Sequence, residues 1–153
     1  MGRIIVTGGF AVEVYTGRTH RTLDVDIIVE GEDASRIVED FLRLFSEKVG
    51  RGYLPYYEAL TVKSIDIVST KYSRIIQPTI LDVDGRRIYL DPPEELIVTY
   101  LAGWKFWDSS EDRDKALWLY IVWSNKLDKK ILGKLADLRD VYDKLVELEE
   151  LVK

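Results

Sequence analysis

Three aspartates in this sequence stand in apolar segments, where a carboxylate is costly to bury. Asp24 and Asp26 alternate with hydrophobic residues in Leu23–Glu30 (LDVDIIVE), and Asp66 lies in Val62–Ser69 (VKSIDIVS). Both segments are rich in Val and Ile, which predicts β-strands. Because alternate residues of a strand share a face, Asp24 and Asp26 are expected on one side, about 6.5–7 Å apart along the backbone. Such carboxylates must be solvated, paired or bound to metal.

This arrangement of carboxylates could support phosphoryl chemistry. Asp24 and Asp26 on one face could hold two divalent cations, as in-line displacement at phosphorus requires. Asp66 on a neighbouring strand could complete the metal site and accept the proton of an attacking hydroxyl. Alternatively, Asp24 and Asp26 lie on a solvated sheet face and pair with Arg18 or Arg21, and Asp66 is a charge that protects a sheet edge.

A glycine pair follows the first predicted strand, Arg3–Thr7, and precedes a short predicted helix, Phe10–Tyr15. Gly8 and Gly9 would let the backbone approach a ligand closely. The free amides at the start of a helix, together with the helix dipole, favour a phosphate group. A plain tight turn explains the same two residues when they are considered alone.

The inventory of metal-binding residues is short. The sequence has no cysteine, which excludes a disulfide framework, a thiolate zinc site and a cysteine nucleophile. His20 is the only histidine, so a histidine-cluster metal site is also excluded. Any metal must therefore be bound by carboxylates, which favours Mg²⁺ or Mn²⁺. His20 itself could act as a general base or a pH sensor, or be an exposed loop residue.

The composition predicts a globular protein. The chain has 153 residues, 46% of them hydrophobic and 32% charged, with a formal net charge of −5. This charge disfavours sequence-independent binding of nucleic acid. No apolar run approaches the roughly 18 residues of a membrane span, and the N-terminus makes a poor signal peptide, so we expect a cytoplasmic protein. Scarce Asn, Gln and Met and abundant charges are typical of proteins from thermophiles.

The remaining elements complete a small sheet and a helical C-terminal part. An Asp84-Gly85 turn predicts a hairpin, and it explains the second Leu-Asp-Val-Asp sequence, at Leu81–Asp84, as part of that turn. The expected elements are an amphipathic helix over Asp33–Val49, hairpin strands over Thr79–Val83 and Arg86–Leu90, a helix capped by Asp91 and ending near Trp107, a helix capped by Ser110 or Asp112 and ending near Asn125, and a last helix over Lys134–Val152.

Alternating strands and helices followed by helices alone predict an α+β fold of α/β type. We expect a small mixed sheet in residues 1–91 and a helical C-terminal segment in residues 92–153 that packs on it.

The motifs of the first part resemble the minimal nucleotidyltransferase domain of the DNA polymerase beta superfamily. The resemblance rests on Gly8-Gly9, the short helix that follows, Thr22, and Asp24-x-Asp26 in an apolar strand. The form Gly8-Gly9-Phe10-Ala11 is most similar to the AbiEii-like branch, found in toxin–antitoxin and phage-defence systems. The sequence departs from the family at His20, where an arginine is frequent.

The second part carries further elements of the resemblance. Asp66 fits the family's third carboxylate, and Asp91–Leu96 (DPPEEL) leading to Lys105 resembles a later helix of the family. Arg113-Asp114-Lys115 only partly matches a still later segment, because Ala116 stands where the family has an aspartate.

The resemblance implies a role for each of these residues. Gly8 and Gly9 would hold the triphosphate of an NTP, Asp24 and Asp26 would ligate Mg²⁺ (or Mn²⁺), Asp66 would ligate the catalytic metal and help to activate the acceptor, and Lys105 would contact phosphate or an acidic group of a partner. A structural alternative for Lys105 is that its side chain lies along Trp104.

The implied activity is transfer of a nucleoside monophosphate from an NTP to a hydroxyl of a protein or RNA acceptor, within a toxin–antitoxin system. An alternative is a catalytically degenerate nucleotidyltransferase-fold module that binds a toxin or antitoxin partner. A third is a small domain whose aspartates are only surface charges. The helical part holds all four tryptophans, at positions 104, 107, 118 and 123. They could fill a core or form a partner or homodimer surface, as could the apolar stripe over Leu138–Val152.

Overall fold

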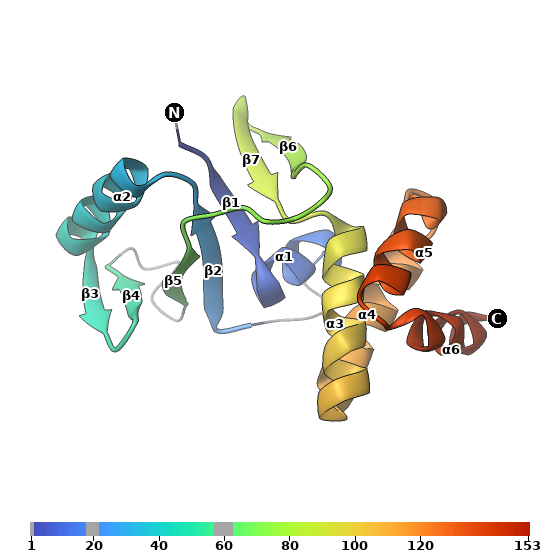
Figure 1. Ribbon diagram of the computed structural model, residues 1–153. Helices are drawn as coiled ribbons and strands as arrows, with labels where there is room; N and C mark the ends of the chain where they lie inside the picture. The colour runs from blue at the N-terminus through green and yellow to red at the C-terminus, as the bar shows by residue number, and fades with distance from the viewer. Residues whose placement is uncertain (1, 18–21, 57–62) are drawn as a thin grey trace. The chain divides into compact units, whose positions relative to one another are not determined.

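The computed structural model describes residues 2–17, 22–56 and 63–153. The chain forms two compact units (Figure 1). The first comprises Met1–Glu13 and Arg21–Asp91, and the second comprises Val14–His20 and Pro92–Lys153. The first unit contains the sheet and the second is helical.

The described part of the first unit is built on one mixed sheet of seven strands, in the order β3-β4-β5-β2-β1-β7-β6 (Figure 1). The prediction of an α+β fold with a small mixed sheet is therefore confirmed. The elements in chain order are β1 (Ile4–Thr7), α1 (Gly8–Tyr15), β2 (Asp24–Val29), α2 (Glu32–Phe45), β3 (Ser46–Val49), β4 (Gly52–Pro55), β5 (Ser64–Ser69), β6 (Thr79–Val83) and β7 (Arg86–Leu90).

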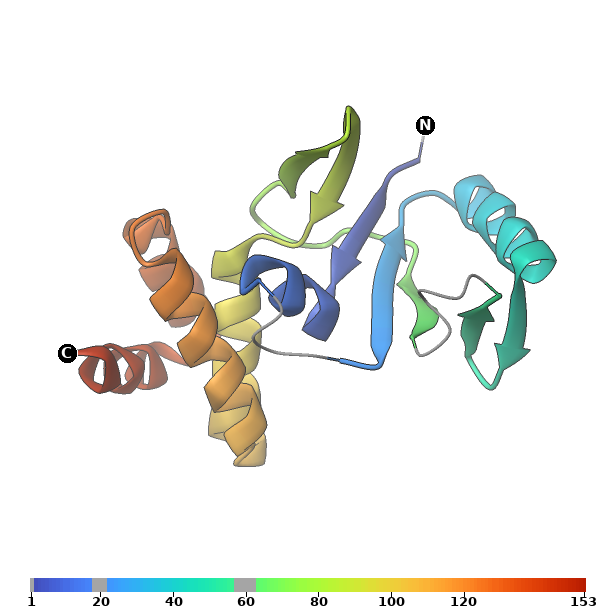
Figure 2. The same ribbon diagram turned by 180° about the vertical axis from the view of Figure 1, so that it is seen from behind.

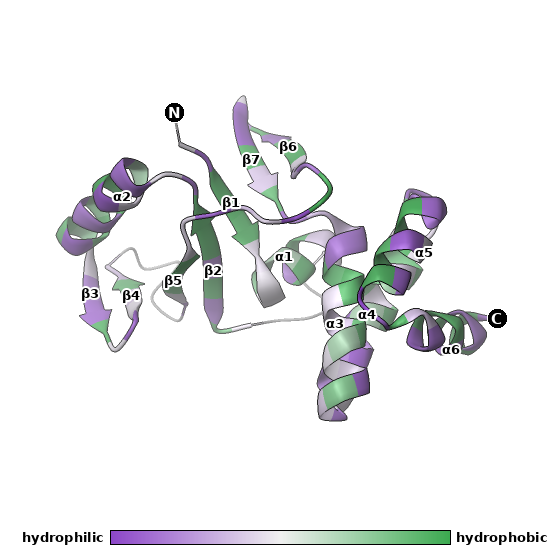
Figure 3. Cartoon of the chain, in the orientation of Figure 1, coloured by the Kyte–Doolittle hydropathy of each residue, from purple (hydrophilic) through white to green (hydrophobic). Residues whose placement is uncertain are grey.

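The middle of the sheet combines a buried core with a polar beginning of β2. β2 pairs antiparallel with β1 and parallel with β5, and β1 pairs parallel with β7. The last three residues of β2, Ile27–Val29, are all buried. Figure 3 shows the change along β2 from hydrophilic to hydrophobic. The apolar end anchors the strand in the sheet, which leaves its first residues free to present carboxylates.

The predicted helix over Asp33–Val49 is too long. α2 ends at Phe45, and Ser46–Val49 forms β3, which pairs with β4. Gly50, with a φ of 60°, adopts the left-handed conformation that lets the chain reverse between these strands. The helical spacing of Val49 was therefore accidental, because the glycines after it make a hairpin. On α2, the ring centroids of Phe41 and Phe45 lie 4.6 Å apart with the rings tilted, and both side chains are more than half exposed.

The second unit contains four helices in the part of the chain that the structure describes after Asp91. They are α3 (Pro93–Trp107), α4 (Ser110–Trp123), α5 (Lys129–Leu138) and α6 (Tyr142–Val152). None of the helices in the described ranges has the length and apolar character that crossing a membrane requires.

Two predicted helix starts are wrong in detail. The N-cap of α3 is Pro92, without a side-chain capping bond, and Asp91 does not cap the helix. Glu94, three residues after Asp91, accepts the backbone N–H of Asp128 at 2.9 Å. α4 is capped by Ser109, whose hydroxyl accepts the N–H of Asp112 at 3.1 Å.

The predicted last helix is two helices. The break lies at Asp140, whose φ of 56° is left-handed and incompatible with a continuous helix. The guanidinium of the neighbouring Arg139 binds two residues of α3: it donates to the Glu95 carboxylate at 2.6 Å and to the Thr99 hydroxyl at 3.2 Å. The predicted stripe is buried at Val141, Leu145 and Leu148, while Leu138 is 70% exposed.

The tryptophans divide between packing and surface. Trp123 contacts Tyr15 edge to face at 5.0 Å and donates its indole N–H to the Tyr15 carbonyl at 2.8 Å. Trp107 is 83% exposed and Trp118 is 43% exposed, so these two do not fill a core.

Asp91, which does not cap α3, holds the end of β1 through hydrogen bonds within the first unit. Its carboxylate is fully buried and accepts the hydroxyl of Thr7 at 2.7 Å. Arg74 donates to the same oxygen through two nitrogens, at 2.9 and 3.2 Å. The backbone N–H of Asp91 bonds to Val6 at 2.8 Å. These bonds hold the last residues of β1, immediately before Gly8.

Replacing Asp91 should test this fastening. We expect Asp91→Ala to lower the free energy of unfolding by about 3–5 kcal/mol, because Arg74 and Thr7 lose a buried charged partner. Asp33→Ala removes an exposed ion pair with Arg36 and should cost less than about 1 kcal/mol. Urea unfolding followed by circular dichroism measures both. Equal losses would show that the Asp91 cluster does not hold β1.

Candidate active site

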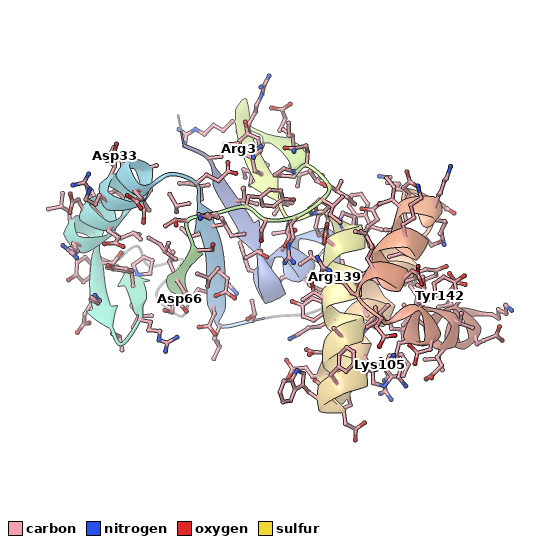
Figure 4. All side chains as sticks on the ribbon, viewed as in Figure 1. Arg3, Asp33, Asp66, Lys105, Arg139 and Tyr142 are labelled. Carbon is pink, nitrogen blue, oxygen red and sulfur yellow. The ribbon has the colours of Figure 1, made fainter. Side chains whose placement is uncertain are left out.

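The strand register brings two of the three predicted carboxylates side by side. Asp26 on β2 is the direct partner of Asp66 on the parallel strand β5, and Asp24 is the partner of Ser64. Figure 4 labels Asp66 on β5, beside β2. Asp24, Asp26 and Asp66 thus come from adjacent strands at the polar beginning of the pair. Asp24 is exposed, while Asp26 and Asp66 are half-buried.

The three negative charges act on one another most strongly at Asp26. The pKa of Asp26 is raised above its ordinary value, first by burial and then by the charges of Asp66 and Asp24. The ionised Asp26 therefore opposes folding when no cation is bound, and a cation placed here would relieve this penalty. The donor set consists of carboxylate oxygens, which suit Mg²⁺ or Mn²⁺.

The structure does not gather these groups into a finished metal site. Within residues 2–17, 22–56 and 63–153, no three or more acidic or histidine side chains are close enough together to hold a metal ion. The assignment of Asp24, Asp26 and Asp66 as metal ligands therefore stays a prediction.

The glycine turn lies against the Asp26 carboxylate. α1 begins at Gly8 itself, directly after β1, and Thr7 of β1 is the register partner of Asp26. Gly8 has a φ of 64°, and a Cβ there would lie 2.7 Å from Oδ2 of Asp26. A Cβ on Gly9 would lie 3.3 Å from the Thr22 side chain. Glycine at position 8 thus allows the backbone at the start of α1 and the carboxylate to approach closely.

Two residues beside Asp66 escaped the sequence analysis. The hydroxyl of Ser64 lies 3.5 Å from Oδ1 of Asp66. A Cβ on Gly52 of β4 would meet that same oxygen at 2.6 Å and would also clash with Ser64. In the sequence, Gly52 only follows the end of the helix expected over Asp33–Val49. Its actual role became visible only with the pairing of β4 and β5.

Lys105 belongs to the other unit and has local partners there. Its ammonium donates to the Asp143 carboxylate at 3.0 Å and to the Asp140 carbonyl at 2.6 Å. Figure 4 shows Lys105 on α3. The hydrogen bond to Asp143 raises the pKa of Lys105. Binding of phosphate by Lys105 stays a prediction. Its ammonium lies 5.5 Å from the centre of the Phe106 ring, and the ammonium of Lys144 lies over the Trp104 ring.

Several candidates lie outside the described residues. These are Arg18, His20 and Arg21, so their predicted pairing or catalytic roles stay predictions.

Comparison with known proteins identifies the fold. No protein-family model matches the sequence, and no curated protein is a significant match. Solved structures do match, and they show that the chain has the fold of nucleotidyltransferases. One is an antigenic nucleotidyltransferase-like protein from Paracoccidioides brasiliensis, with a TM-score of 0.60 and 16% identity, covering 96% of this chain and 84% of that chain.

The antibiotic-resistance factor ANT(2'')-Ia is similar in two structures. Its solution structure matches with a TM-score of 0.54 and 18% identity, covering 97% of this chain and 88% of that chain. Its crystal structure in complex with adenylyl-2''-tobramycin matches with a TM-score of 0.55 and 15% identity, covering 95% and 89%. These likenesses confirm the nucleotidyltransferase fold that the motifs suggested. The finer resemblance to the AbiEii-like branch stays a prediction.

The close approach at Gly8 can be tested with a matched pair of variants. Gly8→Ala and Gly50→Ala each place a Cβ at a φ near 60°, which costs about 1–2 kcal/mol. Gly50 has open space around it, whereas the Gly8 variant also meets Asp26. We expect Gly8→Ala to lose at least about 1 kcal/mol more in chemical denaturation. Equal losses would contradict a tight contact between the turn and Asp26.

The charge crowding at Asp26 predicts a pH dependence in metal-free buffer. Because the pKa of Asp26 is raised in the folded protein, its ionisation lowers the free energy of unfolding. This destabilisation is complete above the raised pKa and disappears as the pH falls below the ordinary value of 3.8. Asp26→Asn should therefore raise the melting temperature at pH 7, by about 2–4 °C for each kcal/mol relieved. The gain should vanish near pH 3.5. A gain that is the same at both pH values would exclude charge as its cause.

Proposed function

We propose that this chain is a metal-dependent nucleotidyltransferase that transfers a nucleoside monophosphate from an NTP to an acceptor hydroxyl. The observation that carries the proposal is the placement of Asp26 beside Asp66 in register, with the Gly8 turn against the Asp26 carboxylate. The backbone at the start of α1, which we propose binds phosphate, and the carboxylates are thereby adjacent in one unit. The nucleotidyltransferase fold of the matching structures supports the same activity.

The reaction would proceed in one displacement at the α-phosphorus. The acceptor oxygen forms a bond to phosphorus, the bond from phosphorus to the bridging oxygen of pyrophosphate breaks, and pyrophosphate leaves with the electron pair. Asp66 is proposed to accept the hydroxyl proton. The backbone amides at Gly8 and Gly9, at the start of α1, would hold the triphosphate.

Asp24, Asp26 and Asp66 are the proposed ligands of Mg²⁺ or Mn²⁺. When bound, such ions stabilise the charge that develops on the phosphoryl oxygens. Burial, and then the charges of Asp66 and Asp24, raise the pKa of Asp26, and a dication bound beside these carboxylates would offset both effects.

The proposed acceptor group is a hydroxyl. One matching structure contains adenylyl-2''-tobramycin, an adenylyl group on an acceptor molecule, which supports nucleotidyl transfer as the reaction type. By the resemblance to the AbiEii-like branch, we propose a hydroxyl of a protein or RNA acceptor, and a cognate toxin or antitoxin as partner.

A thermal-shift titration tests the nucleotide site. Each of the four NTPs is added at about 100 times its dissociation constant, with and without Mg²⁺. Binding at that level stabilises the fold by about 2.7 kcal/mol, a rise of about 5–10 °C. We expect a magnesium-dependent shift in the wild type and none in Asp24→Asn/Asp26→Asn, each compared with its own ligand-free melting temperature.

The chain supplies its own control in the second Leu-Asp-Val-Asp sequence. Asp82 and Asp84 lie at the β6–β7 hairpin, and Asp84 occupies the turn with a φ of 50°. Asp82→Asn/Asp84→Asn should retain the full nucleotide shift. If no NTP stabilises the wild type, nucleotidyl transfer is contradicted, and the catalytically degenerate binding module becomes the better account.

A further inference from the structure

A largely buried ion pair lies next to Thr22, at the edge of the candidate site, and takes no part in the proposed chemistry. Glu13 on α1 and Lys63, the residue before β5, pair at 3.1 Å, with side chains only 3% and 16% exposed. Lys63 also lies 5.3 Å from the Phe10 ring. The pair therefore joins the helix that begins at the glycine turn to the strand that carries Asp66.

Both partners also hold the backbone of one residue, Thr22. The Thr22 N–H donates to the Glu13 carboxylate at 3.0 Å, and the Lys63 ammonium donates to the Thr22 carbonyl. The Thr22 hydroxyl accepts the N–H of Asp24 at 3.4 Å. Thr22 precedes the first β2–β5 register pair, Asp24 with Ser64. In the described residues, its backbone is held by these side chains rather than by the sheet.

The bonds converge where the site elements meet. Thr22 is two residues before Asp24, so an extended chain places the side chains of Thr22, Asp24 and Asp26 on the same face. The Thr22 side chain lies against Gly9. A shift of Thr22 would therefore move the carboxylates of β2 relative to the glycine turn and to Asp66. Charge-assisted hydrogen bonds are directional, so a pair that grips both backbone groups of one residue fixes that residue's position.

Stability alone is a weak reason for such a pair. Replacing a buried ion pair by apolar groups of similar volume is often neutral or stabilising, because both charges must be desolvated. We infer that Glu13 and Lys63 are positioning residues, which hold Thr22 so that a cation can bind Asp24, Asp26 and Asp66 beside the Gly8-Gly9 turn. This inference rests on the proposed function.

The test compares two double variants of the full chain. Glu13→Gln/Lys63→Met removes both charges of the positioning pair and nearly keeps its volume. Glu95→Gln/Arg139→Met does the same to an ion pair of the helical unit, between Glu95 of α3 and Arg139, the residue after α5. The paired atoms lie 2.6 Å apart, with Glu95 fully buried and Arg139 31% exposed. Urea unfolding measures the stability of each variant, and water-proton relaxation measures its affinity for Mn²⁺ without any nucleotide or acceptor.

We expect the Glu13/Lys63 variant to remain folded and to bind Mn²⁺ about 10-fold more weakly, as is typical when groups that orient metal ligands are lost. The Glu95/Arg139 variant should bind Mn²⁺ like the wild type, even if it is less stable. Unchanged affinity in the Glu13/Lys63 variant would overturn the positioning role and leave the proposed function intact. If the wild type itself binds no Mn²⁺, the metal site fails, and the positioning role fails with it.

Discussion

Two carboxylates on adjacent parallel strands repel each other, and the sheet of this protein nevertheless pairs Asp26 with Asp66 in register. Burial raises the pKa of Asp26 most, and the charge of Asp66 raises it further. The remainder of β2 makes the arrangement tolerable, because Ile27–Val29 are buried and secure the strand between β1 and β5. The buried apolar half of β2 thus stabilises the strand enough to keep the charged residues of its other half in place.

The glycine turn and the carboxylates are held to each other from two directions. On one side, buried Asp91 binds Thr7 and Arg74 and fastens the end of β1 just before Gly8. On the other side, Glu13 and Lys63 grip Thr22 just before Asp24. Figure 2 shows from behind that β1 leads directly into α1 and that β2 lies beside β1 in the sheet. The proposed phosphate-binding turn and the proposed cation ligands on β2 would need fixed relative positions, and these two charged clusters hold the backbone beside each of them.

Local chemistry explains which parts could be predicted from the sequence. The hairpin at Asp84-Gly85 was predicted to the residue, because the turn type is set by two adjacent residues. The nucleotidyltransferase fold followed from a short motif, Gly8-Gly9 and Asp24-x-Asp26. In contrast, Asp91 had the pattern of a helix cap, but its buried bond to Arg74 is a tertiary contact that no local pattern encodes. The break at Asp140 likewise depends on a partner distant in sequence, because the neighbouring Arg139 donates to Glu95.

The central claim is that a cation and a triphosphate meet at the polar beginning of β2. The most direct measurement is a crystal structure with Mn²⁺ and a non-hydrolysable NTP analogue, with data collected at a wavelength where manganese scatters anomalously. The account predicts an anomalous peak bounded by Asp24, Asp26 and Asp66, with the triphosphate on the amides of Gly8 and Gly9. Manganese and nucleotide bound elsewhere on the chain, with these carboxylates unligated, would contradict it.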